Sequence, residues 1–359
     1  MFFFEIMTAS PDFRENNNKI MVKKQEFLND VRKNGKVVKW DIHKSQSKKL
    51  ASSFDRLGND KKAWLVNNCA NYLEFKVYED GLKDLTHAEF CKVRLCPMCA
   101  WRRSIKLFVQ TSRIMEFLAN KNFRYIFLTL TQKNVTAEQL PDELDRLFYA
   151  FEKFCKNKRF KALSKGWFRC LEITHNFKKF LKDESDVYHP HFHMVIAVNE
   201  SYFTDKAIYI SQKEWANMWQ KALGVDYIPQ VDVRSVKSDN KDCKVYKKSV
   251  AELSKYTVKV QDYIIEPFKE YEKTGLFEPL KQECEKITDG IVETLDKALF
   301  NRRLVAYGGE FKKAHKLLNL DDVLDGDLIN VDGQEIRSDL FYVLETYRWQ
   351  IGLNRYVKI

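Results

Sequence analysis

Hydrophobic and polar positions in the middle of the chain follow two patterns, which predict a succession of strands and helices. Residues 123–132 (FRYIFLTLTQ) are rich in β-branched and aromatic side chains, as is typical of a strand. Residues 136–158 repeat apolar side chains on one face, with acidic residues early and basic residues late, which predicts a helix. The same reasoning predicts strands over 166–176, 188–200 and 227–237, and helices over 100–118, 211–223 and 247–263.

From residue 123 to residue 263 the predicted order is β-α-β-β-α-β-α. Two strands that follow each other across a short polar loop favour a hairpin, so we expect an α+β fold with helices packed on an antiparallel sheet. Ser211 is the expected N-cap of its helix. Four regions are predicted: a flexible or loosely helical leader (1–45), a cysteine-rich segment (46–110), the central α+β domain (111–263) and a mostly helical C-terminal region (264–359) with an acidic, turn-rich stretch at 320–335.

Charge is distributed unevenly along the 359 residues. The formal net charge is +11, but residues 263–359 carry 14 basic and 18 acidic side chains, which leaves +15 on the first 262 residues. A basic body of this kind favours a polyanionic partner such as DNA, because each neutralised phosphate releases counterions. Charge alone is equally compatible with a role in solubility.

The sequence shows neither a signal peptide nor an apolar run long enough to span a membrane. We therefore expect a cytoplasmic protein with no membrane partner. In that reducing setting, clustered cysteines indicate metal ligands rather than disulfides.

Four of the eight cysteines are clustered. Cys91, Cys96 and Cys99 form a compact set and Cys69 precedes them, which predicts a structural zinc site with four thiolate ligands. His87 could replace one cysteine, and four buried free cysteines are the alternative. The adjacent Trp-Arg-Arg at 101–103 could present cations to bases or phosphates.

Three histidines alternate along the predicted strand 188–200. His189, His191 and His193 share one face, because successive side chains of a strand point to opposite sides. Pro190 marks the strand start or an edge, which makes His189 the least anchored. If the preceding strand pairs as a hairpin, Glu172 completes a two-histidine, one-carboxylate set suited to Mg²⁺ or Mn²⁺. The alternative is a solvent-facing surface that carries these polar residues.

The predicted helix 247–263 carries a carboxylate and a phenol four residues apart, Glu252 and Tyr256, with Lys259 three residues beyond. A phenol is a poor nucleophile at neutral pH unless a cation or a polarised phosphate assists it. Taken alone, this segment is an ordinary amphipathic helix.

Together, three segments resemble the HUH endonucleases: FLTLT (127–131), HPHFHMV (189–195) and ELSKYTVK (252–259). With the block CKVRLCPMCAWRRS (91–104), they are similar to the replication initiators of rolling-circle plasmids of Gram-positive bacteria. The resemblance runs from about residue 69 to residue 263 and extends into 298–320. It implies a nicking domain of the ferredoxin-like, split βαβ type over 111–263.

The resemblance also implies residue roles and partners. His191, His193 and Glu172 would bind the divalent ion, and Tyr256 would attack a phosphodiester at the plasmid double-strand origin, leaving a 5′-phosphotyrosine and a 3′-hydroxyl primer. Glu252 would activate water in the closing cleavage, and Lys259 would assist. Tyr263 is a weaker nucleophile candidate. A host helicase and polymerase are expected partners, the nicked DNA is expected to be single-stranded, and a homodimer is compatible with this scheme.

Three other functions fit parts of the pattern. A transposase of the same superfamily would keep the chemistry, whereas a zinc-containing DNA-binding protein would lack it. An iron oxygenase would use the same three ligands, but would leave the basic charge and Tyr256 unexplained.

Overall fold

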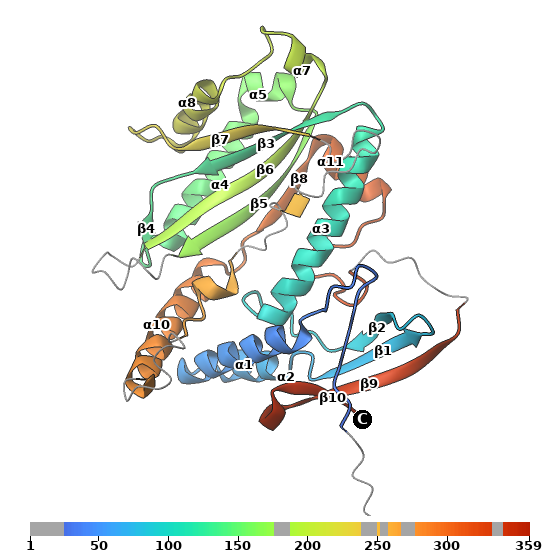
Figure 1. The fold of residues 1–359 in the computed structure, drawn as a ribbon. Coiled ribbons are helices and arrows are strands. Elements are labelled where there is room, and N and C mark those ends of the chain that lie inside the picture. Colours follow the sequence, from blue (N-terminus) through green and yellow to red (C-terminus); the bar gives the residue numbers. More distant parts are fainter. Residues whose placement is uncertain (1–24, 176–186, 238–249, 252–257, 267–276, 332–339) are drawn as a thin grey trace, which may run out of the picture.

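The computed structural model describes residues 25–175, 187–237, 250–251, 258–266, 277–331 and 340–359 (Figure 1). Its helices are α1 (Trp40–Arg56), α2 (Asp60–Asn68), α3 (Pro97–Ala119), α4 (Leu140–Lys156), α5 (Lys158–Leu163), α7 (Ser201–Thr204), α8 (Gln212–Leu223), η1 (Val260–Asp262), α10 (Phe277–Ala298), α11 (Gly309–Leu317) and η3 (Ile351–Leu353). Its strands are β1 (Tyr72–Tyr78), β2 (Lys83–Ala88), β3 (Arg124–Thr131), β4 (Val135–Thr136), β5 (Gly166–His175), β6 (Val187–Val198), β7 (Val231–Val236), β8 (Val305–Gly308), β9 (Tyr342–Gln350) and β10 (Arg355–Lys358).

The larger sheet has the strand order β7-β3-β6-β5-β8, with β4 paired to β6. All of its pairs are antiparallel, and β5 and β6 form the predicted hairpin, in which Glu172 lies opposite His191. The prediction of an α+β fold with an antiparallel sheet is therefore confirmed. Ser211 is the N-cap of α8, as predicted, and Glu214 bonds back to it to complete a capping box that was not predicted.

Helices cover both faces of this sheet, because β6 is apolar on both sides. Phe192 packs against Phe148 and Phe151 of α4, and α8 lies on the same side. Val195, on the opposite face, belongs to a second core cluster with Leu107 of α3. His191 and His193 lie on the same face as Val195 but are not part of its apolar cluster.

The smaller sheet, β10-β9-β1-β2, joins the cysteine-rich segment to the C-terminus (Figure 1). Strand β9 pairs along the whole of β1, and Tyr347 and Trp349 of β9 are buried. The C-terminal region thus contains the expected helices but also three strands, β8, β9 and β10, so the prediction of a mostly helical region was incomplete. Strands β8 and β9 pair with β5 and β1, which lie far away in the sequence, and local patterns do not reveal such pairing.

The predicted boundaries at residues 45 and 110 fall inside helices α1 and α3. Helix α1 begins at Trp40, which is buried and donates its indole N–H to Asp30 at 2.7 Å. In the described part of the chain, no helix is both long and apolar enough to cross a lipid bilayer.

The predicted helix 247–263 is not continuous. Residues 250 and 251 are helical, residues 252–257 lie outside the described part, and Lys259 is extended before the single 3₁₀ turn η1. Lys259 therefore does not continue a helical face, as the spacing had suggested. Tyr263 is buried and its hydroxyl donates to the carbonyl of Leu95 at 2.6 Å, so it is a core residue rather than a nucleophile.

Arg102 and Arg103 of α3 are not at the surface, so the expectation that they present cations to bases or phosphates was wrong. Both are buried, and their guanidinium groups donate to carbonyls of the acidic stretch, Arg102 to Leu328 and Ile329 and Arg103 to Leu324. A buried guanidinium needs several acceptors, and a turn-rich segment offers carbonyls that no helix or strand has used. The two arginines thus attach residues 324–329 to α3.

We expect Arg102→Met to lower the free energy of unfolding by about 3 kcal/mol, because it leaves buried carbonyl groups without a donor. Urea denaturation measures this loss. Arg113→Met, an exposed position on the same helix, should change stability little. If Arg102→Met instead left stability intact and weakened DNA binding, the arginine would be a DNA contact after all.

Candidate metal centres and active site

Glu172, His191 and His193 converge on one face of the larger sheet. Their ligand atoms all lie within 4.8 Å of one another, and all three residues are buried. His193 Nε2 lies 2.8 Å from Glu172 Oε2, and His191 Nε2 lies 3.5 Å from the same oxygen. The hairpin register creates this set, because Glu172 is directly opposite His191 and His193 is the next residue on that face.

The second nitrogens of both imidazoles are held by neighbours. His191 Nδ1 donates to the carbonyl of His189 at 3.0 Å, which leaves its Nε2 with a lone pair directed at His193 Nε2, 3.2 Å away. His193 Nδ1 lies 3.2 Å from the Thr129 hydroxyl on β3. Two ring nitrogens that face each other at this distance repel unless a proton or a cation lies between them. The donors therefore fit a divalent ion, and their outer bonds orient the rings as metal sites require.

The electrostatics of the set depend on Lys259, whose ammonium lies 3.0 Å from Glu172 Oε1. Burial alone would raise the pKa of Glu172, but the adjacent imidazoles of His191 and His193 and the ammonium of Lys259 hold it well below its usual range. Glu172 is thus ionised whenever the protein is folded at neutral pH. An ionised buried carboxylate beside two imidazoles provides the negative charge that a dication needs.

His189 lies outside the convergent set. Its Nδ1 is 3.0 Å from the side-chain oxygen of Asn134, and burial lowers its pKa to about 4. Asp262, which the sequence analysis missed, lies close enough to Lys259 and Glu172 for their charges to act on it. Burial raises the pKa of Asp262 to about 6. Thr129, which belongs to the segment FLTLT, was also missed as a contact of His193.

Two predicted site residues, Glu252 and Tyr256, lie outside the described residues. The structure therefore brings together His191, His193, Glu172 and Lys259 from the predicted active site, and does not describe the other two.

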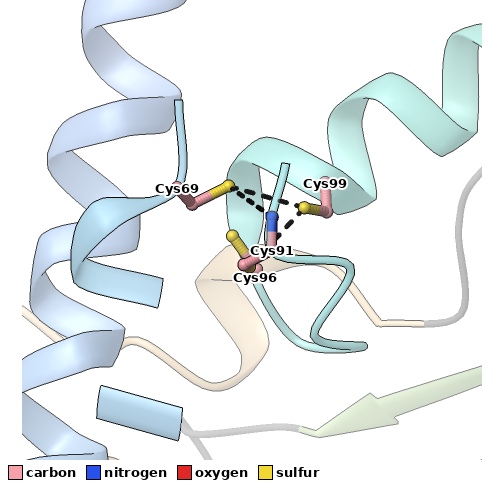
Figure 2. Close-up of side chains that lie close together, drawn as sticks. All are labelled: Cys69, Cys91, Cys96 and Cys99. Carbon is pink, nitrogen blue, oxygen red and sulfur yellow. Dashed lines mark hydrogen bonds between the residues drawn. The ribbon is translucent and has the colours of Figure 1, made fainter. Parts of the chain in front are cut away.

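The four predicted cysteines come together at the junction of α2, β2 and α3 (Figure 2). Cys69 Sγ lies 3.6 Å from Cys99 Sγ, and Cys91 Sγ lies 3.7 Å from Cys99 Sγ. Four thiolates around zinc, with bonds of about 2.3 Å at tetrahedral angles, stand roughly 3.8 Å apart. The donor set therefore fits a structural zinc ion, with all positions filled by protein.

His87, the alternative ligand, is exposed on β2 and does not belong to this group. Burial would raise the pKa of Cys96, but hydrogen bonds from the other three cysteines and from the Ser47 hydroxyl, 3.5 Å away, hold it well below its usual range. One thiolate is thus favoured even without a metal.

A fully buried ammonium group lies behind the cysteine cluster. Lys44 Nζ donates to the carbonyls of Cys69 at 2.5 Å and Asn67 at 3.0 Å. Burial lowers the pKa of Lys44 to about 8, and the charges of the nearby cysteines oppose this. A zinc ion with four thiolates carries a net charge of −2, so a buried cation beside it offsets part of the charge.

We expect Lys44→Met to speed the release of zinc to a chelator by about 10- to 100-fold, as for other groups that support metal ligands. A colorimetric zinc indicator follows the release. Lys49→Met, an exposed change on the same helix, serves as the control. Equal release rates for the two variants would show that Lys44 only fills space.

The chain is similar to known replication proteins. Residues 82–357 match the family model described as replication protein. Protein rep of Bacillus amyloliquefaciens is 36% identical over 357 residues, covering 92% of this chain and 97% of that protein. Protein rep of a Bacillus species is 39% identical over 310 residues (82% and 91%), and that of Lentilactobacillus hilgardii is 33% identical over 338 residues (92% and 98%). No solved structure matches the chain significantly.

The family model covers most of the chain, and the relatives align over nearly their full length. The chain therefore belongs to the replication protein family. Its relatives named Protein rep come from Bacillus, Streptococcus and other Gram-positive bacteria. The predicted resemblance to replication initiators of rolling-circle plasmids is thereby confirmed.

Proposed function

We propose that this chain initiates plasmid rolling-circle replication by nicking one strand of the double-strand origin with Tyr256. The observation that carries the proposal is the buried set of Glu172, His191 and His193, with Lys259 at its edge. A set of two imidazoles and one carboxylate suits Mg²⁺ or Mn²⁺ and leaves coordination positions for a phosphate.

Chain connectivity supports Tyr256 as the nucleophile. It precedes Lys259 by three residues, so the two Cα atoms are separated by at most about 11 Å. Because the Lys259 ammonium contacts Glu172, this length of chain is short enough to allow the Tyr256 phenol to approach the same site.

In the proposed cleavage, the Tyr256 phenol loses its proton and its oxygen attacks the scissile phosphorus. The bond from phosphorus to the 3′-oxygen breaks, and that oxygen takes up a proton to become the 3′-hydroxyl. A bound divalent ion would act as a Lewis acid on the phosphate. Lys259 adds positive charge beside the site, which favours the phenolate. The 5′-phosphotyrosine link conserves the bond energy for rejoining.

Termination is assigned to Glu252, which would accept a proton from water as it attacks in the closing cleavage, so that the enzyme is released. The strand at the nick is proposed to be single-stranded, because a duplex holds its phosphate away from a recessed site. The 3′-hydroxyl would prime a host polymerase, and a host helicase would open the duplex.

An SDS-stable adduct between the protein and a supercoiled plasmid carrying its origin tests the proposal. We expect wild-type protein with Mg²⁺ or Mn²⁺ to form the adduct, and mass spectrometry to locate it on Tyr256. Tyr256→Phe should still bind the origin but form no adduct, whereas Tyr263→Phe should form it in any folded fraction.

The other candidate functions predict different results. A binding protein without catalysis gives no adduct with wild-type protein. A transposase cleaves transposon ends rather than a plasmid origin. An iron oxygenase consumes oxygen with ferrous ion and leaves the plasmid intact.

A further inference from the structure

A cavity of about 240 Å³ lies beside strand β8, the edge strand of the larger sheet, and helix α11. Its lining combines cationic, aromatic and acidic side chains, among them Arg303, Tyr307, Lys312, His315, Lys316 and Asp322. We call it the β8–α11 pocket. No step of the proposed nicking reaction uses these residues.

The charge of the pocket is positive. Lys312 and Lys316 are four residues apart on α11, so they project from the same helix face. Both are exposed, and within the described residues neither forms an ion pair, in contrast to Lys313, which pairs with Glu310 at 2.7 Å. Arg303 adds a third cation against the single carboxylate of Asp322. An anion would find uncompensated positive charge there.

The pocket also has an aromatic wall. The rings of Tyr307 and His315 lie 4.9 Å apart, tilted by 41°, and Phe168 supports Tyr307 from the sheet at 5.1 Å. Aromatic rings interleaved with cations are what proteins use to bind single-stranded nucleic acid, because rings stack on bases while cations contact phosphates. A simple anion site would need no such wall.

The pocket lies on the same side of the sheet as Glu172, His191 and His193. Tyr307 is paired with Phe168, and Phe168 and Glu172 share a face of β5 because they are four residues apart. That separation corresponds to about 14 Å along the strand. A single strand of a few nucleotides is long enough to span a separation of this size.

We infer that the β8–α11 pocket binds a nucleotide of the single strand that is being nicked, with its base against Tyr307 and His315 and its phosphates near Lys312 and Lys316. The inference rests on the proposed nicking function. It assigns the C-terminal block around α11 to holding the substrate strand.

Binding of fluorescent oligothymidylate, followed by anisotropy as a function of salt, tests the phosphate contacts. Lys312→Ala/Lys316→Ala should bind roughly tenfold more weakly at physiological ionic strength and reduce the salt slope by about 1.4. Lys213→Ala/Lys221→Ala removes the same charge from α8, on the opposite face of the sheet, and should leave the slope unchanged. Equal slopes for the two variants would overturn the inference.

A photo-crosslink tests the aromatic wall. Oligothymidylate with 5-iodouracil in place of thymine should crosslink to Tyr307 or His315, as mapped by mass spectrometry, and His315→Ala should lower affinity on the order of tenfold through lost stacking. Crosslinks confined to other regions, or a loss of duplex binding only, would contradict a single-strand pocket.

Neither experiment requires cleavage. Failure of the adduct assay with normal pocket results would therefore count against the nicking function alone. Normal adduct formation with unchanged oligothymidylate binding would count against the pocket alone.

Discussion

His193→Ala should lower the rate of strand cleavage by about a thousandfold at saturating Mg²⁺ or Mn²⁺. The ring nitrogen of His193 is 2.8 Å from Glu172 and 3.2 Å from His191, so its removal leaves an incomplete donor set. A bound metal contributes several kcal/mol to stabilising the charge of the transition state, and each 1.36 kcal/mol is tenfold in rate. Single-turnover cleavage of an oligonucleotide that spans the nick site measures the effect.

Two variants on the same face of the sheet serve as comparisons for the His193→Ala rate. His189→Ala removes an imidazole that lies outside the convergent set and should change the rate less than tenfold. Thr129→Val removes only the hydroxyl beside His193 Nδ1. Its cleavage rate should lie between those of the two histidine variants, about 10- to 100-fold below wild type. If His193→Ala cleaved as fast as His189→Ala, the metal assignment would have to be withdrawn.

The second large effect concerns the cysteine cluster. Cys99→Ser should release the zinc and lower the thermal midpoint on the order of 10 °C, because structural zinc contributes about 10–16 kcal/mol in small zinc-dependent domains. Cys69 follows α2, Cys91 follows β2, and Cys99 lies in the first turn of α3, so the metal would hold three elements together. Elemental analysis and calorimetry measure the two changes.

Cys155→Ser provides the matched control. Cys155 is half-buried on α4 and lies outside the metal-binding group, and burial raises its pKa to about 12. This variant should keep full zinc content and lose little stability. A wild-type protein without stoichiometric zinc, and indifferent to chelators, would mean that the cysteines are only buried thiols.

Local patterns account well for the central sheet. Two segments form strands as predicted: the β-branched run at 123–132 and the segment with alternating His189, His191 and His193. In each of them, consecutive residues favour the same extended conformation. The hairpin joins β5 and β6, which are neighbours in the sequence. The proximity of Glu172 to the histidines could therefore be predicted from the sequence. The cysteine spacing was informative for the same reason, since three of its ligands lie within nine residues.

Other features depended on distant partners. Arg102 and Arg103 have the composition of a DNA contact, yet the acidic stretch more than 200 residues later covers them and takes up their hydrogen bonds. Lys259 was expected on a helical face, but the helix has ended before it, and its contact with Glu172 comes from the path of the chain over the sheet.

By itself, the sequence determined the elements that form from neighbours: the antiparallel hairpin, the capped helix α8, and the grouping of histidines and cysteines into two donor sets. Only the tertiary structure decided which charged side chains remain exposed, where β8, β9 and β10 pair, and that Tyr263 belongs to the core. The physical reason is the sequence separation over which each kind of interaction acts. Backbone preference and side-chain alternation act over a few residues, whereas burial and strand pairing depend on segments that meet only when the whole chain has folded.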